Sequence, residues 1–304
     1  MQGRIWLKAI RPQFFTATLI PVFLGGILGW YETGNFNLIF FLLSLIGGIF
    51  IHAGLNLAND YFDHTSGVDD LNPFPTPFSG GSRVIQEGLL SPREILRASI
   101  LFFLGGVGIG LYLNAILPGN TLLWIGILGV FLAFFYTGEP LRIGYTGLGE
   151  FSVFLGFGPV MVMGSYFVQA KTLSILPLLA SIPVGILIAL VLYINEFPDF
   201  EADKEGGKRT LVVILGKRKA VNLYVCFLGF VYLWIIGGII FGFFPPLTLL
   251  TLLTLPLAFS AIRVARKNYN RIKELLPANA LTILLHLTLG IILSLSYLLT
   301  GLFK

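Results

Sequence analysis

The chain has 304 residues, of which 56% are hydrophobic and only 12% are charged, and its mean hydropathy is +0.86. A soluble protein carries about 25% charged residues, so this composition excludes a soluble globular domain, while 28 Phe exclude disorder because such side chains require burial. A single cysteine excludes a disulfide framework and a cysteine-based metal site. These properties predict an all-α, polytopic membrane protein that forms one domain over residues 1–304.

Apolar runs long enough to cross a bilayer, about 20 residues each, occur nine times along the chain. Turn-forming sequences separate them, among them Leu117-Pro118-Gly119-Asn120 and the Pro245-Pro246 pair. The runs lack the two-residue alternation of a transmembrane barrel. The nine predicted spans cover residues 14–30, 37–60, 95–116, 120–136, 148–168, 174–195, 220–243, 245–265 and 277–300. Glycine pairs such as Gly25/Gly29 and Gly106/Gly110 are expected to permit close helix packing.

Positive charge is distributed very unevenly between the two sides of these spans. All but two of the 20 Lys and Arg residues fall on one side, and the exceptions are Lys171 and Lys304. The positive-inside rule then predicts a cell-membrane protein with a cytoplasmic N-terminus, cytoplasmic long loops and an external C-terminus. The same distribution explains the net charge of +5 without a basic nucleic-acid-binding face. The basic segment 1–12 lacks a small-residue cleavage site after it, so it is expected to be retained.

Two acidic motifs follow predicted spans, one at Asn59–Asp70 and the other at Asn195–Asp203. Both begin Asn-[Asp/Glu]-x-x-Asp, and the aspartates Asp63 and Asp199 lie 136 positions apart. The repeated pattern suggests an internal duplication of helix groups. On a helix, residues four apart share a face, so Asn59 and Asp63 lie together, as do Asn195, Asp199 and Asp203.

Two such faces turned toward each other would gather several carboxylates in one pocket, which is stable only with cations between them. Oxygen ligands favour Mg²⁺ or Ca²⁺ over Zn²⁺, and Mg²⁺ commonly bridges carboxylates to phosphate oxygens, so a diphosphate-bearing substrate is expected. The alternative is that these are solvated loop acids, but two matching clusters in matching positions disfavour it. The predicted metal ligands are Asn59, Asp60, Asp63, Asp69, Asn195, Asp199 and Asp203.

Glycine-rich basic loops follow both acidic motifs. Ser79-Gly80-Gly81-Ser82-Arg83 comes after the first, and Gly206-Gly207-Lys208-Arg209 after the second. Backbone N–H groups and cationic side chains in such loops can bind a phosphate, although the spacing of a Walker A loop is absent. The positive charges of Arg209 and of residues 217–219 are sufficiently explained by their position beside a cytoplasmic helix end, without a role in phosphate binding.

The paired motifs on nine spans resemble those of the UbiA superfamily of intramembrane prenyltransferases, and within it the 1,4-dihydroxy-2-naphthoate polyprenyltransferases. Other matching segments lie along most of the chain: Trp6 to Pro12 with Pro21 and Gly25, Tyr136-Thr137-Gly138, Gly147 to Glu150, Phe157 to Tyr166, and Gly207 to Leu211. Two features depart from the superfamily pattern. In the common superfamily pattern, the last acid of the first motif follows the preceding acid by four residues, and Gly67 occupies that position here. The acid comes at Asp69 instead, a spacing that resembles the menaquinone branch. The second motif has Glu196 where Asn or Asp is expected, which puts a metal role for Glu196 in doubt.

The resemblance implies a horseshoe of nine helices around a central cavity, capped on the cytoplasmic side by the two motif loops. It implies Mg²⁺-dependent transfer of a polyprenyl group from its diphosphate to an aromatic acceptor, most simply 1,4-dihydroxy-2-naphthoate with loss of CO₂. Asp63, Asp199 and Asp203 would be the catalytic carboxylates. The residues expected to contact the diphosphate are Arg83, Arg142 and Lys208, and those considered for the acceptor or prenyl pocket are His52, Tyr136, Tyr145 and His286.

Several alternatives compete with this hypothesis. A cation transporter would use ionisable groups near the bilayer midplane and interrupted helices, whereas these acids lie at helix ends. A CDP-alcohol phosphotransferase would need a compact Asp-x-x-Asp-Gly-x-x-Ala-Arg motif, which is missing. Within the superfamily, 4-hydroxybenzoate, geranylgeranylglyceryl phosphate and chlorophyll-type acceptors stay open.

Overall fold

The computed structural model describes residues 2–303, and helices supply all of the regular structure among them apart from one isolated bridge between Thr76 and Ser79. The all-α prediction is therefore confirmed. The elements are α1 (Gln2–Ile10), η1 (Pro12–Phe14), α2 (Thr16–Thr33), α3 (Leu38–Thr65), α4 (Pro92–Ile116), α5 (Thr121–Phe134), η2 (Ile143–Tyr145), α6 (Gly149–Leu155), the π-helical turn η3 (Gly156–Val160), α7 (Met161–Ala170), α8 (Ile175–Glu205), α9 (Leu211–Leu215), α10 (Lys217–Ile240), η4 (Pro246–Thr254), α11 (Leu255–Asn268) and α12 (Ile272–Leu302).

Seven helical segments within residues 2–303 are long and apolar enough to cross a membrane, and α1–η1 with α2 forms an eighth if this pair, bent by 54°, counts as one span. The protein is thus an integral, multi-pass membrane protein. The predicted fourth span corresponds to α5, which is apolar but only 14 residues long. The total of nine spans stays a prediction because α5 is shorter than the roughly 20 residues that a perpendicular crossing needs.

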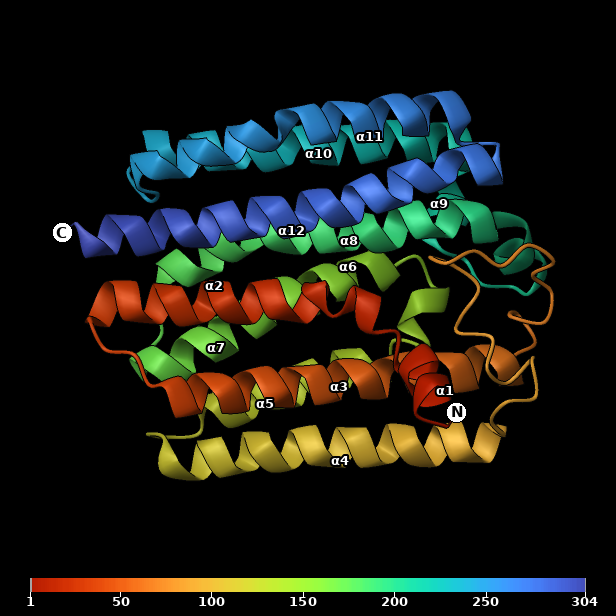
Figure 1. Cartoon of the computed structure of the whole chain (residues 1–304), viewed down its shortest axis with the longest axis horizontal. Helices are drawn as coiled ribbons and strands as arrows, with labels where there is room; N and C mark the ends of the chain where they lie inside the picture. The colour runs from red at the N-terminus through yellow and green to blue at the C-terminus, as the bar shows by residue number, and fades with distance from the viewer. Residues whose placement is uncertain (1, 304) are drawn as a thin grey trace.

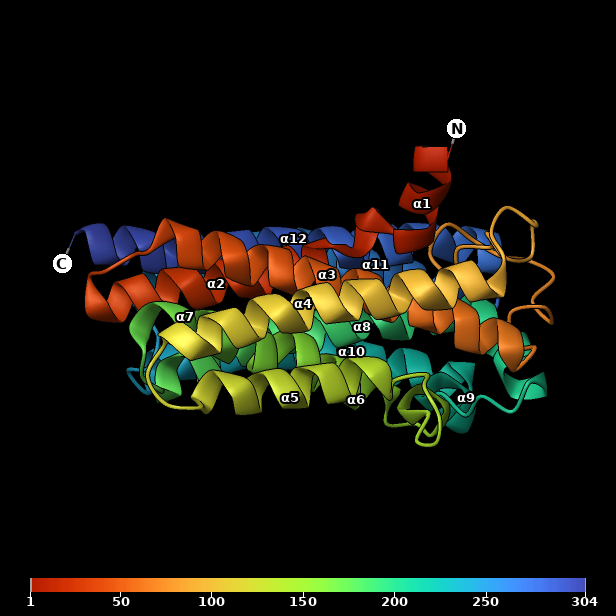
Figure 2. The same cartoon turned by 90° about the horizontal axis from the view of Figure 1, so that it is seen from below.

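The long helices lie side by side along one axis, and the connections with polar sequence gather at one end of the bundle (Figure 1). The segment between α3 and α4, the segment around α9, and α1 are all at that end, whereas α12 finishes at the other. Figure 2 shows α1 projecting away from the bundle. Both acidic motifs therefore lie at the same end, because α3 and α8 each run toward it.

Local signals in the sequence explain where the helices that carry the motifs begin. The Asn37 side chain accepts a hydrogen bond from the Phe40 N–H (3.0 Å) and so caps the start of α3. Ser174 caps α8 in the same way through the Leu176 N–H (3.3 Å). Such caps satisfy donors that an α-helix cannot pair internally.

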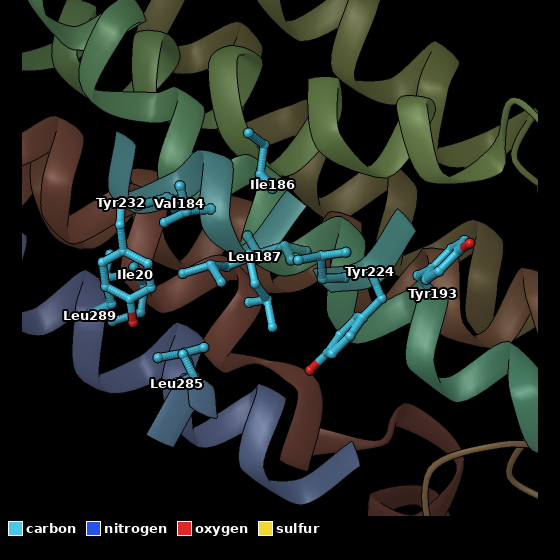
Figure 3. Packing of buried hydrophobic residues seen from close by; sticks show 14 of the residues in the cluster. Ile20, Val184, Ile186, Leu187, Tyr193, Tyr224, Tyr232, Leu285 and Leu289 are labelled. Carbon is cyan, nitrogen blue, oxygen red and sulfur yellow. The ribbon is translucent and has the colours of Figure 1, made fainter. Parts of the chain in front are cut away.

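The main hydrophobic core joins α2, α7, α8, α10 and α12 (Figure 3). Leu187 of α8 is completely buried there, as are Leu285 and Leu289 of α12, while Ile20 of α2 packs against the glycine at position 290. This half of the molecule is densely packed. The large cavity described below lies on the other side of α7, between it and α3, α4 and α5.

The glycine pairs have different roles in the two halves. A Cβ on Gly25 would lie 2.4 Å from the Val162 carbonyl oxygen, and one on Gly29 would lie 2.6 Å from the Gln169 Cβ, so both permit the α2–α7 contact. Gly106 permits the α3–α4 contact in the same way, since its Cβ would lie 2.7 Å from Ile51. The expectation for Gly110 is wrong: a Cβ there meets nothing within 4 Å, because this residue borders the cavity.

Candidate active site

A polar cavity of about 180 Å³ lies between the ends of α3 and α8, under the segment that joins α3 to α4. Its lining contains four aspartates and three asparagines drawn from both motifs and from this segment. They are Asn59, Asp63, Asp69, Asn72, Asn195, Asp199 and Asp203. The two motifs therefore share one cavity, as the sequence pattern predicted.

Asp63 lies at the centre of the contacts on the α3 side. One of its carboxylate oxygens accepts a hydrogen bond from the Tyr145 hydroxyl (2.6 Å). The other accepts from the Asn59 amide (2.8 Å) and forms an ion pair with Lys208 (2.9 Å). The predicted pairing of Asn59 with Asp63 across one helical turn is thus present, and α3 continues to residue 65 to provide it.

Asp199 is held from the opposite wall by the segment between α3 and α4. Asn72 donates its amide to one oxygen (2.7 Å), and the backbone N–H of Gly80 donates to the other (3.1 Å). Gly80 has φ +78°, a conformation that favours glycine. The loop glycine therefore has a defined function as a carboxylate contact.

Asp69 extends into the cavity beside Gly81, whose Cβ, if present, would lie 2.6 Å from an Asp69 carboxylate oxygen. Burial, together with the charge of Asp63, raises the pKa of Asp69 to about 8. The ionised form of the Asp69 carboxyl group is therefore disfavoured unless a cation lies close to it.

Lys208 lines the cavity and brings a positive charge to it, while Tyr145, predicted for the acceptor or prenyl pocket, borders neither cavity and lies behind Asp63 and Lys208. Burial lowers the pKa of Lys208, but the attraction of Asp63 and Asp203 outweighs this effect and holds its pKa well above the ordinary value, so the ammonium stays charged. The Lys208 Nζ also lies 5.2 Å from the centre of the Tyr145 ring. Burial raises the pKa of Tyr145 above its ordinary value, so its hydroxyl remains a hydrogen-bond donor.

Arg11 was not expected in the site. It lines the cavity, donates to the Asn59 amide oxygen (3.2 Å) and pairs with Asp60 (3.3 Å). The sequence showed Arg11 as a basic residue before the first span, within the segment Trp6 to Pro12 that resembles the family, but gave it no contact with the acidic motifs. Asn72 was likewise not singled out, because a lone amide in a loop carries no pattern.

Some of the predicted site residues do not border the polar cavity. Asp60 is 3% exposed and is bound by Arg11 and by the Ser82 hydroxyl and N–H. Arg83 turns to the Asp69 carbonyl oxygen (2.5 Å), and Arg142 pairs with exposed Glu139 (2.6 Å). The side chains of these three residues are thus bound by other groups of the same chain and do not point into the polar cavity.

A second, larger cavity of about 590 Å³ runs between α3, α4, α5 and α7, and its lining is almost entirely apolar. It meets the polar cavity at residues that border both, namely His52, Leu55, Tyr136, Val153 and Phe157. His52 accepts or donates a hydrogen bond with Thr18 (2.8 Å) and lies edge-on to Phe157. His286 is buried in α12 and borders neither cavity.

The donor set of the polar cavity fits a hard cation, since every carboxylate and amide ligand offers oxygen. Within residues 2–303, however, no three His, Cys, Asp or Glu side chains converge closely enough to hold a metal ion. The reason lies in the contacts above: Lys208 pairs with Asp63, and Asn72 with Gly80 occupies Asp199. A metal ion would exchange with these internal partners.

A model of the UbiA prenyltransferase family matches residues 18–289. The chain belongs to the UbiA prenyltransferase family. It is 30% identical over 264 residues to the 1,4-dihydroxy-2-naphthoate octaprenyltransferase of Bacillus subtilis (strain 168), covering 86% of this chain and 82% of that protein. It is 34% identical over 228 residues to the Escherichia coli (strain K12) protein of the same name, covering 73% and 72%.

The fold is also that of a UbiA homolog from Archaeoglobus fulgidus whose structure was solved bound to GPP and Mg²⁺. The TM-score is 0.65 at 16% identity, over 94% of this chain and 98% of that one. As a UbiA prenyltransferase, this protein is an enzyme that transfers prenyl groups, and the resemblance of the motifs to that family is confirmed.

Proposed function

We propose that this UbiA prenyltransferase transfers a polyprenyl group from its diphosphate to 1,4-dihydroxy-2-naphthoate, with release of CO₂, in menaquinone synthesis. The acceptor is proposed from the names of the Bacillus subtilis and Escherichia coli relatives. The observation that carries the reaction type is the junction of an acidic polar cavity with a long apolar cavity. Such a junction suits a substrate with a diphosphate head and a hydrocarbon tail.

The diphosphate would lie in the polar cavity, with the prenyl tail extending into the apolar one. Lys208 and Arg11 present positive charge to the head group. Asp63, Asp69, Asp199 and Asp203 would hold Mg²⁺, with Asn59 and Asn195 as amide ligands, in keeping with the Mg²⁺ in the Archaeoglobus fulgidus homolog. When bound, Mg²⁺ would neutralise charge on the leaving diphosphate.

In the proposed reaction, the allylic C–O bond breaks and its electron pair leaves on the diphosphate. The ring carbon that bears the carboxylate attacks the allylic carbon, and loss of CO₂ restores the aromatic ring. Tyr136 and Phe157 line the junction, where their aromatic faces can stabilise the allylic cation and exclude water. Lys208, which pairs with Asp63 in the metal-free site, would be released when Mg²⁺ binds that carboxylate. Beside the Tyr145 ring it would then offer a charge-assisted donor to the departing phosphate.

We further propose that the end of the bundle with the motif segments faces the cytoplasm of the cell membrane, because most Lys and Arg residues belong to connections at that end. The chain would act as one domain. Its motifs at 59–70 and 195–203 would derive from an internal duplication.

The decisive assay uses the purified full chain with Mg²⁺ and one polyprenyl diphosphate. The acceptors are 1,4-dihydroxy-2-naphthoate, 4-hydroxybenzoate and geranylgeranylglyceryl phosphate, and products are identified by mass spectrometry. The expected product is the prenylated naphthalenediol that has lost CO₂. Prenylation of another acceptor, with the naphthoate left unchanged, would overturn the proposed acceptor while leaving the family assignment intact.

A further inference from the structure

Glu196 occupies a distinctive position on the wall that α8 contributes to the polar cavity. The residues of α8 that line this cavity change along the helix from apolar (188, 191 and 192) to acidic (199 and 203). Glu196 lies at the change, one helical turn before Asp199. Its carboxyl group therefore lies one helical turn from Asp199, toward the part of the cavity whose lining is apolar.

The partner of Glu196 is a second carboxyl group. Glu196 and Glu150 are only 6% and 7% exposed, and their carboxyl groups lie within hydrogen-bonding reach of each other. Oε2 of each has no hydrogen-bond partner, and within residues 2–303 neither group forms an ion pair. Glu196 therefore carries a buried carboxyl oxygen that has no partner in the protein.

The two members of the pair differ in what else they contact. Glu150 accepts a hydrogen bond from the Leu211 N–H (2.8 Å) and does not line the polar cavity, so it is the fixed member behind the wall. Glu196 lines the cavity, its Oε2 has no hydrogen-bond partner, and no N–H group of residues 2–303 donates a hydrogen bond to it. Burying a carboxyl group without hydrogen-bond donors costs free energy. The donor for Oε2 of Glu196 therefore has to come from a molecule bound in the cavity.

The surroundings define the chemistry of that donor. The lining of the cavity includes the aromatic side chains of Tyr136 and Phe157, and Tyr136 is close enough to interact electrostatically with Glu196. A flat ring bearing a hydroxyl group fits between such faces and an unsatisfied carboxyl oxygen. A hydrated cation would gain less there than between Asp199 and Asp203, because Val191 and Leu192 line the adjoining part of α8.

We infer that Glu196 accepts a hydrogen bond from a ring hydroxyl of the aromatic acceptor and is a specificity-determining residue for it. This inference rests on the proposed function, in that the acceptor is taken to be a hydroxyarene. Glu150 holds Glu196 in position, and the contact places the acceptor ring one turn of α8 from Asp199, next to the expected position of the allylic carbon. No bond is made or broken by Glu196.

The test measures equilibrium binding to the purified full chain by calorimetry, without a prenyl donor. The probes are 1,4-dihydroxy-2-naphthoate and its two monomethyl ethers. The wild type should bind one of the ethers about tenfold more weakly than the diol, as expected when a buried acceptor loses its donor. Glu196→Gln, which keeps the size of the side chain and can donate to Glu150, should bind the diol and that ether equally. Glu201→Gln, at an exposed position on the same helix, should behave as the wild type.

The outcomes separate this inference from the proposed function and from metal binding. Unchanged discrimination in Glu196→Gln, no discrimination in the wild type, or no binding of the diol would overturn the inference. A loss of Mg²⁺-dependent thermal stabilisation in Glu196→Gln equal to that of Asp199→Asn would also overturn it, because Glu196 would then be a metal ligand. Discrimination that depends on Glu196, without prenyl transfer to the naphthoate by the wild type, would support the inference and reject the proposed acceptor.

Discussion

Asp199 and Asp70 are two aspartates of opposite character at the same end of the molecule. Asp199 lines the polar cavity, whereas the side chain of Asp70 is 49% exposed and contacts only His64 among the ion pairs of residues 2–303. Asp199→Asn should reduce turnover by at least about a thousandfold. The variant would lose a carboxylate that holds Mg²⁺, and Mg²⁺ neutralises the charge on the leaving diphosphate. Asp70→Asn should leave turnover within about twofold, because surface ion pairs contribute little. Steady-state prenyl transfer checks both, and near-normal turnover by Asp199→Asn would contradict the two-motif site.

Variants of Lys208 and Lys217 distinguish a direct contact with the diphosphate from a general effect of positive charge on donor binding. Lys208→Ala should weaken binding of the prenyl diphosphate by about 2 kcal/mol, the usual contribution of a charge-assisted hydrogen bond. Lys217 lies over the Phe200 ring, 4.9 Å from its centre, and outside the cavity, so Lys217→Ala should have little effect. Donor titrations would measure both affinities. Equal losses would mean that the donor recognises overall potential instead of a defined contact.

Asp69 makes the response to Mg²⁺ depend on pH. Its pKa of about 8 in the folded protein lies above the ordinary 3.8, so the metal-free fold binds a proton that the unfolded chain releases. This contribution to stability is complete below pH 4 and is lost as the pH rises toward 8, by at most about 1.4 kcal/mol per pH unit. Mg²⁺ competes with that proton, so the increase in unfolding temperature on adding Mg²⁺ should be larger at pH 8 than at pH 6. Asp69→Asn should reduce this difference, and an equal increase at both pH values in the wild type would contradict the prediction.

At the level of the helices, Gly110 and Gly108 offer a matched test of the apolar cavity. Both are on α4, and a Cβ on either would meet nothing within 4 Å, but only Gly110 lines the cavity. Gly110→Leu should fill the part of the cavity distant from the acidic motifs. It should therefore lower turnover of long polyprenyl donors about tenfold or more relative to geranyl diphosphate, because a long tail no longer fits without distortion. Gly108→Leu should leave this ratio unchanged, while both variants gain about 1 kcal/mol of helix propensity. Donor competition, analysed by mass spectrometry, measures the ratio.

The helices were easier to predict than the contacts that complete the site. Hydropathy is a local property, so the sequence was sufficient to predict α3 and α8, and the spacing of four was sufficient to pair Asn59 with Asp63. The loop contacts are not local: Asn72 reaches Asp199 across 127 positions, and Lys208 reaches Asp63 across 145. A periodic pattern indicates which residues share one helix face, but it contains no information on which loop will fold over that face.

For the whole molecule, the asymmetry of charge and the positions of the motifs make a prediction about the membrane. The segment around Phe74 and the segment around Glu205 are at one end of the bundle, while the turn that contains Asn120 is at the other (Figure 1). Single cysteines at these three positions, each exposed, can be placed in a chain whose exposed natural cysteine is removed by Cys226→Ser. A membrane-impermeant thiol reagent applied to intact cells should label only the cysteine at position 120, because the positive-inside rule places the other two in the cytoplasm. In inverted membrane vesicles the pattern should reverse. Labelling of positions 74 and 205 from opposite sides would rule out a shared cavity, since the two acidic motifs could not then meet in one diphosphate site.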